Sequence, residues 1–353
     1  MIYLAYLVLE NGMTFEGQRI GAPLNRIGEL VFTTGVVGYL ETLTDPSYYG
    51  QIVTHSFPTI GNYGVIEDDF EGEPALFGYI VRELCATPSN FRSSSPLNDY
   101  LLQKGIPGLC GVDTRAIVQT VREHGVMNAM ICDEPPEDLI ALRAYRVSRA
   151  VPSVTGRLQR EYPAEGLQKH RVALMDYGVK LNIIRSLQRR GCHVTVWPAA
   201  TKAEEVLSSA PDGIVLSNGP GDPKDNPDCI CEIRKMLGVK PVFGICLGHQ
   251  LTAIALGGDT AKLKYGHRGG NQPVKDVKTG RVWTTSQNHG YAVLSDSLKG
   301  IGNERFINAN DGSCEGFDYP QLRCFTVQFH PEACPGPSDT SFLFDRFIEM
   351  MGA

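Results

Sequence analysis

Apolar and polar residues follow two different rhythms along this chain, and the second rhythm begins near Arg171. There, short apolar runs are separated by segments in which apolar positions recur every three or four residues, the period of an amphipathic helix. The runs predict strands, and the periodic segments predict helices that end at glycines such as Gly191. Strands that alternate with helices in this way predict an α/β domain over residues 171–353, with a mainly parallel sheet and helices on both faces. Its predicted strands include residues 172–175, 194–196, 213–216, 242–243 and 324–329.

The first part of the chain predicts a different domain, strand-rich and of mixed α/β type, over residues 1–133. The pair Asn11-Gly12 between two apolar runs is typical of a two-residue hairpin turn. Further runs rich in β-branched residues predict strands, and Asp113 predicts the N-cap of a helix that ends at Gly125. Residues 134–170 contain several prolines and many polar residues, which predicts a linker segment between the two domains.

Composition narrows the class of protein without identifying it. The chain has 353 residues, too many for one ordinary core, and its 42% hydrophobic and 20% charged residues are typical of a globular protein. A net charge of −6 and the lack of long basic runs argue against nucleic acid or an anionic membrane as partners. The apolar start has no basic residues and is too short to cross a bilayer, so it predicts structure rather than a targeting signal. The ten scattered cysteines predict reduced thiols in a cytoplasmic protein.

Residues 241–250 carry the strongest candidate for catalysis. They predict a buried strand, a sharp turn and a helix, with Cys246 on the turn and Gly244 and Gly248 two positions to either side. Gly-x-Cys-x-Gly at a strand-to-helix turn matches a nucleophile elbow, whose strained turn a flanking Cβ would crowd. The helix N-terminus favours the thiolate, and the N–H of Leu247 is free to bind an oxyanion. A buried cysteine with only a packing role is the alternative.

A base and an orienting group for this thiol are predicted at the end of the last strand. His330 follows the strand at residues 324–329, and Glu332 stands two positions later. Because residues i and i+2 of an extended chain face the same side, the Glu332 carboxylate can hold the second nitrogen of the imidazole. Two rival histidines are weaker candidates: His249 shares the nucleophile's own helix, and His289 lies in a predicted loop that suits a structural role.

A glycine-rich loop at residues 217–223 follows another buried strand. A tight turn would explain this composition by itself. The functional alternative is a backbone anion site, in which the N–H groups of Gly219 and Gly221 face the thiol and complete an oxyanion hole with Leu247. The chain contains no Gly-x4-Gly-Lys phosphate loop, and its histidines and cysteines are too dispersed to predict a metal site.

Several motifs together carry a resemblance to a known family. Residues 218–223, 244–250 and 330–332, in this order, resemble the class I glutamine amidotransferases. Other motifs resemble the carbamoyl phosphate synthase small (glutaminase) subunit, and they lie at residues 44–48, 60–64, 89–92, 111–115, 176–182 and 266–271. The resemblance implies a C-terminal class I glutamine amidotransferase domain, preceded by the N-terminal domain of the small subunit.

The resemblance also implies roles for individual residues. Cys246 would attack the side-chain amide of glutamine, His330 would act as base and acid, and Glu332 would orient it. The oxyanion would be stabilised by Leu247 and Gly219. The residues that would hold the rest of L-glutamine are Ser47, Gly221, Gln250, Asn288, Gly290 and Tyr291. Without the family, the simpler interpretation of Ser47 is a turn hydroxyl that bonds its own backbone.

The partners follow from the same resemblance. The ammonia would pass through an internal tunnel to a large synthetase subunit, which makes carbamoyl phosphate from bicarbonate and ATP for arginine and pyrimidine biosynthesis. No cofactor is expected on this chain, whereas ATP and a divalent metal are expected on the large subunit. The two chains would form a heterodimer or a higher oligomer of heterodimers. Two alternatives stay open: a glutaminase subunit of another synthase, such as anthranilate synthase, and a non-catalytic partner-binding subunit.

Overall fold

The computed structural model describes residues 3–333 and 336–352, which form two compact units. The first unit is Met1–Ser148 and the second is Arg149–Ala353. The division falls inside residues 134–170, and this segment is folded rather than extended. Its part before the division contains α4 (Ile140–Ala144), and its part after it contains α5 (Ala150–Val154) and β8 (Arg160–Tyr162). No helix of the described residues is long and apolar enough to cross a bilayer.

Seven strands of the first unit close into a barrel in the order β1-β2-β6-β5-β4-β3-β7, and β7 pairs with β1. The predicted hairpin is present, since β1 and β2 are antiparallel and Gly12 takes a φ of 92° in the turn. Its predicted two-residue turn is wrong, because residues 10–13 separate the two strands. Asp113 caps α3 as predicted, because its carboxylate accepts the N–H of Ala116 at 3.0 Å. The elements are β1 (Leu4–Leu9), β2 (Thr14–Gly21), β3 (Arg26–Thr33), α1 (Tyr39–Thr44), β4 (Gln51–Ile60), β5 (Gly78–Leu84), α2 (Leu97–Gln103), β6 (Pro107–Cys110), α3 (Thr114–His124) and β7 (Met127–Cys132).

Alternation along the strands gives the barrel two apolar surfaces. Ile52 and Val53 are adjacent and both fully buried, because successive side chains of a strand point to opposite faces. Ile52 belongs to a cluster that draws residues from the strands and from α3, whereas Val53 packs with residues of α1 and α2. The strand-rich first domain predicted from the sequence is therefore present, and its closure leaves no free sheet edge.

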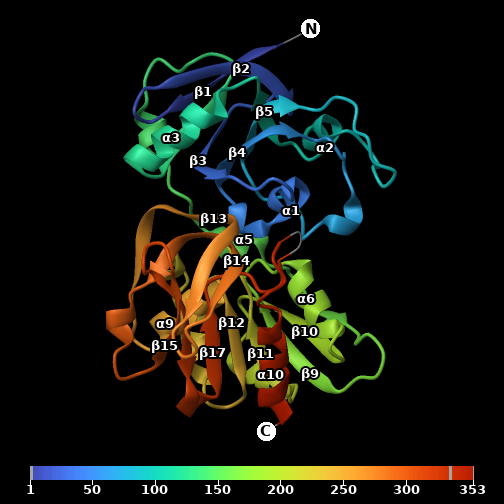
Figure 1. The fold of residues 1–353 in the computed structure, drawn as a ribbon, viewed down its shortest axis with the longest axis vertical. Coiled ribbons are helices and arrows are strands. Elements are labelled where there is room, and N and C mark those ends of the chain that lie inside the picture. The colour runs from blue at the N-terminus through green and yellow to red at the C-terminus, as the bar shows by residue number, and fades with distance from the viewer. Residues whose placement is uncertain (1–2, 334–335, 353) are drawn as a thin grey trace. The chain divides into compact units, whose positions relative to one another are not determined.

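The second unit is built on a ten-stranded sheet in the order β14-β13-β15-β16-β17-β12-β11-β9-β10-β8 (Figure 1). Its central strands β10, β9, β11, β12 and β17 are parallel, as predicted, and the outer strands are antiparallel. The elements are β9 (His170–Asp176), α6 (Leu181–Gln188), β10 (Cys192–Pro198), α7 (Ala203–Ser208), β11 (Gly213–Leu216), α8 (Pro227–Met236), β12 (Val242–Ile245), α9 (Leu247–Ala255), β13 (Thr260–Asp276), β14 (Val282–Val293), β15 (Asn303–Asn308), β16 (Cys314–Tyr319), β17 (Cys324–Val327) and α10 (Phe342–Gly352).

Helices cover both faces of this sheet. Apolar residues of α6 and α10 pack with alternate strand residues such as Phe243, whose ring stacks on Phe325 at 4.4 Å. Residues of α7, α8 and α9 pack with the intervening strand residues, such as Val242. Burial on both faces explains why these strands are continuous apolar runs instead of alternating ones.

The sequence also predicts shorter strands and turns over residues 272–319, with strands at 281–285 and 305–308, and, apart from Arg281, the structure contains these strands within β14 and β15. Residues 260–293 form one long antiparallel hairpin of β13 and β14. Gly266 and Gly269 take positive φ values, 70° and 113°, which accompany two irregularities in the pairing of the hairpin. His289 consequently lies in β14, and the prediction that it belongs to a loop is wrong.

Candidate active site

The carboxyl ends of the central strands bring the predicted chemistry to one edge of the sheet. In the strand register Leu216 pairs with Gly244, and Ile245 pairs with Val327. The segments that follow β11, β12 and β17 therefore begin side by side at this edge. These segments are the glycine-rich loop at residues 217–223, the turn at Cys246 and the chain that leads to His330. The edge is where parallel α/β sheets place their active sites.

Cys246 occupies the sharp turn between β12 and α9. It has φ 53° and ψ −103°, a conformation that non-glycine residues adopt at a cost of about 1–3 kcal/mol. Hydrogen bonds on both sides hold it there: the N–H of Cys246 donates to Val327 at 2.8 Å, and the N–H of Gly248 donates to Ser217 at 3.0 Å. The side chain is almost fully buried, at 2% exposure. The geometry is that of the nucleophile elbow predicted from the sequence.

The two glycines beside the cysteine are required by close packing. A Cβ on Gly248 would lie 2.3 Å from the carbonyl oxygen of Leu216, and one on Gly244 would lie 2.9 Å from the carbonyl oxygen of Gly248. Both distances are shorter than backbone can accommodate without movement of the elbow.

We expect Gly248→Ala to lower the free energy of unfolding by about 1–3 kcal/mol and to reduce catalysis, since the elbow must shift to admit the methyl group. Gly352→Ala is the matched control, because a Cβ there meets no atom within 4 Å. Chemical denaturation of both variants measures the difference. Equal stability of the two variants would contradict the steric account of the elbow.

His330 and Glu332 form a buried pair just beyond β17. The Nδ1–H of His330 donates to Oε1 of Glu332 at 2.7 Å, and both side chains have 0% exposure. The backbone N–H of His330 donates to Ser286 in β14 at 2.9 Å, which fixes the segment at the sheet edge. Because Nδ1 is used in this hydrogen bond, Nε2 is the ring nitrogen that is left for proton transfer. Nε2 is buried and has no hydrogen-bond partner among residues 3–333 and 336–352.

Lys180 joins this pair, a role that its sequence motif did not indicate. Its Nζ lies 3.3 Å from Oε1 of Glu332, and its side chain is only 10% exposed. The backbone of Glu332 is held as well, since the Asn182 amide donates to its carbonyl oxygen at 2.9 Å. Both residues lie in the motif at residues 176–182, which the sequence analysis gives only as part of the family resemblance. The lysine adds a positive charge at the same carboxylate oxygen that the imidazole contacts.

Charges around the pair set its protonation. Burial and the Lys180 charge lower the pKa of His330, but the Glu332 carboxylate and Cys246 outweigh them and raise it above its ordinary value. The influence of Cys246 is consistent with a thiol close to the imidazole. Burial raises the pKa of Glu332, but the charges of His330 and Lys180 lower it by more than burial raises it. The net shift is downward, so this carboxylate stays ionised. Its ion pairs stabilise the fold above the ordinary glutamate pKa of about 4.3, and this contribution is lost as the pH falls through the lowered value.

We expect Lys180→Met to raise the pKa values of both His330 and Glu332, because the lysine charge lowers each of them. Ring-proton NMR of the histidines against pH measures the first shift. Lys202→Met is the control, since Lys202 also lies 3.3 Å from a carboxylate, that of Glu232, but its own side chain is 63% exposed. An unchanged His330 titration in Lys180→Met would contradict the assigned role of this charge.

The glycine-rich loop lies directly against the elbow. A Cβ on Gly219 would lie 2.2 Å from the carbonyl oxygen of Tyr177 and 2.8 Å from the side chain of Leu247, so only glycine fits. Leu247 is the first residue of α9, and its N–H has no partner within the helix. Gly221 takes a φ of 86°, which also favours glycine. The loop is thus a tight turn, and its approach to Leu247 agrees with the predicted anion site.

Three of the residues predicted to hold glutamine lie in β14 and one lies in α9. The carbonyl oxygen of Asn288 is 3.8 Å from the sulfur of Cys246. The Gln250 side chain donates to the carbonyl oxygen of Tyr291 at 2.9 Å and thereby ties α9 to β14. Gly290 lies between Asn288 and Tyr291 in the same strand. The second unit therefore brings this group to the elbow.

Ser47 belongs to the first unit, and its contact with glutamine stays a prediction from the resemblance. It is buried in a short 3-10 turn, Pro46–Tyr48, and its N–H donates to the Asp45 side chain at 2.9 Å. This hydrogen bond uses the backbone of Ser47, and the aspartate rather than the serine hydroxyl caps the turn.

His249, the alternative candidate for the base, has a structural role. It is fully buried in α9, its Nδ1 lies 2.7 Å from the Thr326 hydroxyl and its Nε2 lies 3.9 Å from the Cys314 sulfur. Burial lowers its pKa to about 3, so the ring is neutral. His249 therefore packs the helix against β16 and β17, as expected of a structural histidine.

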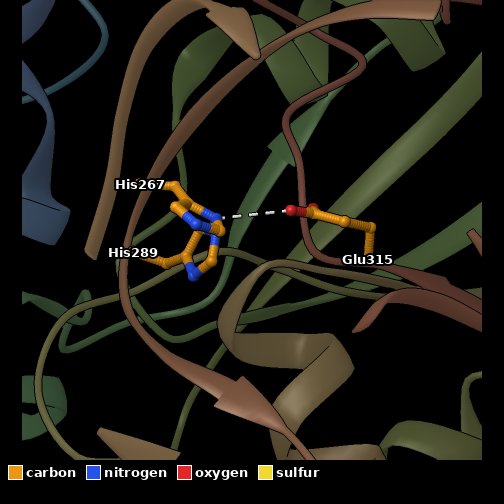
Figure 2. A group of neighbouring side chains, drawn as sticks. All are labelled: His267, His289 and Glu315. Carbon is orange, nitrogen blue, oxygen red and sulfur yellow. Dashed lines mark ion pairs between the residues drawn. The ribbon is translucent and has the colours of Figure 1, made fainter. Parts of the chain in front are cut away.

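His267, His289 and Glu315 form a cluster that sequence spacing did not indicate (Figure 2). One ligand atom of each lies within 4.8 Å of the others, which makes the set a candidate for a metal ion. The ring nitrogens are nevertheless engaged: His267 pairs with Asp311 at 2.8 Å and with Glu315 at 3.4 Å. Carboxylates at both nitrogens favour the imidazolium form, which has no lone pair for a metal. The cluster fits an ion pair better than a metal centre.

Comparison with known proteins assigns the chain to a family. The model of glutamine amidotransferase class-I matches residues 173–350, and the model of the carbamoyl-phosphate synthase small chain, CPSase domain, matches residues 7–131. The second unit thus carries a class I glutamine amidotransferase domain.

Curated relatives agree over almost the whole chain. The carbamoyl phosphate synthase small chains of Listeria monocytogenes serotype 4b (strain F2365) and Bacillus caldolyticus are each 50% identical over 351 residues, covering 98% of this chain and 96% of the relative. That of Clostridium perfringens (strain 13 / Type A) is 49% identical over 351 residues, covering 98% of this chain and 99% of the relative. The chain therefore belongs to the carbamoyl phosphate synthase small chain family, as its motifs predicted.

Proposed function

We propose that this chain hydrolyses L-glutamine at Cys246 and supplies the ammonia to the large chain of a carbamoyl phosphate synthase. The main support is the edge of the sheet in the second unit. There a strained cysteine elbow stands beside a buried His330–Glu332 pair whose carboxylate is 2.7 Å from the ring nitrogen. Family membership supports the choice of substrate and partner, and the side chains of this edge support the chemistry.

In the first step the sulfur of Cys246 attacks the side-chain carbonyl carbon of glutamine. Nε2 of His330 takes the thiol proton, and Glu332 holds the other nitrogen and stabilises the imidazolium that forms. The new carbon–sulfur bond moves an electron pair onto the carbonyl oxygen. The N–H groups of Leu247 and Gly219 bind this oxyanion, a contribution that typically changes the rate by about 10²–10³ for each donor.

In the second step the tetrahedral intermediate collapses and the carbon–nitrogen bond breaks. His330 returns its proton to the departing nitrogen, so ammonia leaves and a glutamyl thioester remains on Cys246. Water then attacks the thioester while His330 takes its proton. Collapse of this second intermediate releases glutamate and restores the thiol.

Recognition of glutamine in this proposal depends on the residues that the family resemblance assigns. Asn288, Gly290 and Tyr291 in β14 hold the α-amino and α-carboxylate end together with Gln250 and Gly221. Ser47 of the first unit adds a further contact to the substrate. The ammonia passes through a tunnel to the large chain, where ATP, a divalent metal and bicarbonate complete the synthesis. The pathways served are arginine and pyrimidine biosynthesis, in the cytoplasm, with a heterodimer or an oligomer of heterodimers as the assembly.

The proposal is tested by measuring glutamate release from glutamine by the purified chain, alone and with the large chain added. We expect slow release by the chain alone, and faster release coupled to carbamoyl phosphate formation in the complex. Stimulation by a different synthase partner would instead favour a glutaminase subunit of that synthase. The absence of glutamate release under both conditions would favour a non-catalytic partner-binding subunit.

A further inference from the structure

Strand β14 forms one wall of the catalytic edge. The carbonyl oxygen of Ser286 accepts the backbone N–H of His330 at 2.9 Å, and the carbonyl oxygen of Asn288 lies 3.8 Å from the sulfur of Cys246. Any movement of residues 286–291 would therefore displace the base and the surroundings of the nucleophile together.

Pairing within the hairpin is weakest at this wall. The register between β13 and β14 is interrupted twice, between Lys262 and His267 and between Gly269 and Gln272. Three pairs of partner residues lie between these interruptions, and we call this short paired segment the island. A slip of one residue in such an island would reverse the faces of its side chains. The three pairs are His267 with His289, Arg268 with Asn288, and Gly269 with Gln287.

A clamp from outside the hairpin holds this island. Nε2 of His267 lies 2.8 Å from Asp311, in the turn between β15 and β16, and Nδ1 lies 3.4 Å from Glu315 in β16. The Glu315 carboxylate is fully buried and accepts a second hydrogen bond from Asn308 at 3.0 Å. The cluster in Figure 2 thus joins three strands, β13, β14 and β16, to one another.

The charges are consistent with such a clamp. Burial lowers the pKa of His267, but Glu315 and Asp311 outweigh it and the net shift is upward. His289 faces the same ring at 5.0 Å, edge to face, and burial and the His267 charge keep its pKa well below the ordinary value. Protonation is therefore favoured on His267 and disfavoured on His289, which limits repulsion between the two rings.

We propose that His267 is a positioning residue for glutamine hydrolysis: the clamp of His267 between Asp311 and Glu315 fixes the register of β14 and so sets the place of Asn288 beside Cys246. This role rests on the proposed function. The titratable groups that face His267 are Asp311, Glu315 and His289. The clamp needs a charged His267 and two ionised carboxylates, and because burial raises the pKa of Glu315, strong acid weakens it. Because the folded pKa of His267 is raised, the clamp also weakens as the pH rises through that raised value, above about 6.5.

The test is His267→Gln, assayed in the complex with the large chain. We expect the KM for glutamine to rise about tenfold or more, with a smaller fall in kcat, because misplacement of a substrate wall costs binding and alignment. Ammonia-dependent synthesis should be unchanged. In the unaltered chain the KM should also rise at alkaline pH, and Glu315→Gln should move this rise to lower pH because it removes a charge that raises the His267 pKa.

His193→Gln is the matched control. The Nε2 of His193 also lies near a carboxylate, that of Glu161 at 3.5 Å, but His193 belongs to β10 and not to the β13–β14 hairpin. An unaltered KM and pH profile in His267→Gln and Glu315→Gln, with glutaminase intact, would overturn the inference and leave the proposed function standing. Loss of thermal stability alone, with the pH profile unmoved, would also overturn it. So would tight binding of one Zn²⁺ per chain that His267→Gln abolishes, since the cluster would then be a metal site. Absence of glutaminase activity in the unaltered chain would instead count against the proposed function.

Discussion

Cys246→Ser should abolish the use of glutamine by the complex while ammonia still supports carbamoyl phosphate synthesis. A hydroxyl is a far weaker nucleophile than a thiolate, and removal of a triad nucleophile in a hydrolase costs up to about 10⁶ in kcat. We therefore expect a loss of at least about 10³, or about 4 kcal/mol of transition-state stabilisation. The measurement is the initial rate of synthesis with each nitrogen source in turn.

Cys231→Ser is the control for this variant, because Cys231 is an exposed free thiol in α8. It should leave both activities at the level of the unaltered chain. If Cys246→Ser lost the two activities equally, Cys246 would have a structural role, and the elbow would be a packing feature.

His330→Asn should cause a loss of similar size in glutamine use. Asparagine retains a polar side chain, but it can neither take the thiol proton nor return one to ammonia. The variant should keep Cys246 and its elbow intact, since the backbone N–H of residue 330 can still donate to Ser286. Its rate should fall by at least about 10³ relative to the unaltered complex, as expected when one member of a catalytic unit is removed.

His124→Asn is the appropriate comparison, because His124 is exposed at the end of α3 in the first unit. His249→Asn adds a second comparison: we expect it to lower stability, through its lost contact with Thr326, more than it lowers activity. A His330→Asn enzyme with near-normal glutamine turnover would show that another residue acts as the base.

Local patterns were sufficient to predict the elbow and the pair beyond β17. The elbow depends on residues 242–251, where a strand, a glycine-flanked cysteine and a helix follow each other directly. His330 and Glu332 meet as predicted from their two-residue spacing, although the chain turns at residues 331–332 instead of continuing extended. The parallel core followed from the alternation of apolar runs with helical segments. For the elbow and the His330–Glu332 pair the decisive contacts are close in sequence, whereas the core was predicted from the order of its elements.

The features that the sequence did not predict depend on contacts between distant segments. Lys180 and Glu332 are 152 positions apart in the sequence. They meet only because the turn after β9 lies beside the chain that follows β17. His267 meets Glu315 only once β13 and β16 are placed around β15. The full length of the β13–β14 hairpin was not predicted, because its pairing is irregular around Gly266 and Gly269 and joins residues up to 33 positions apart, Thr260 and Val293.

The central claim is a covalent bond between glutamine and the sulfur of Cys246, and the most direct measurement is mass spectrometry of an acid-quenched complex after mixing with isotope-labelled glutamine. We predict that the labelled glutamyl group is found as a thioester on the peptide that contains Cys246, and that it is absent in Cys246→Ser. Active turnover with no label on this peptide, or with the label on a different cysteine, would contradict the account.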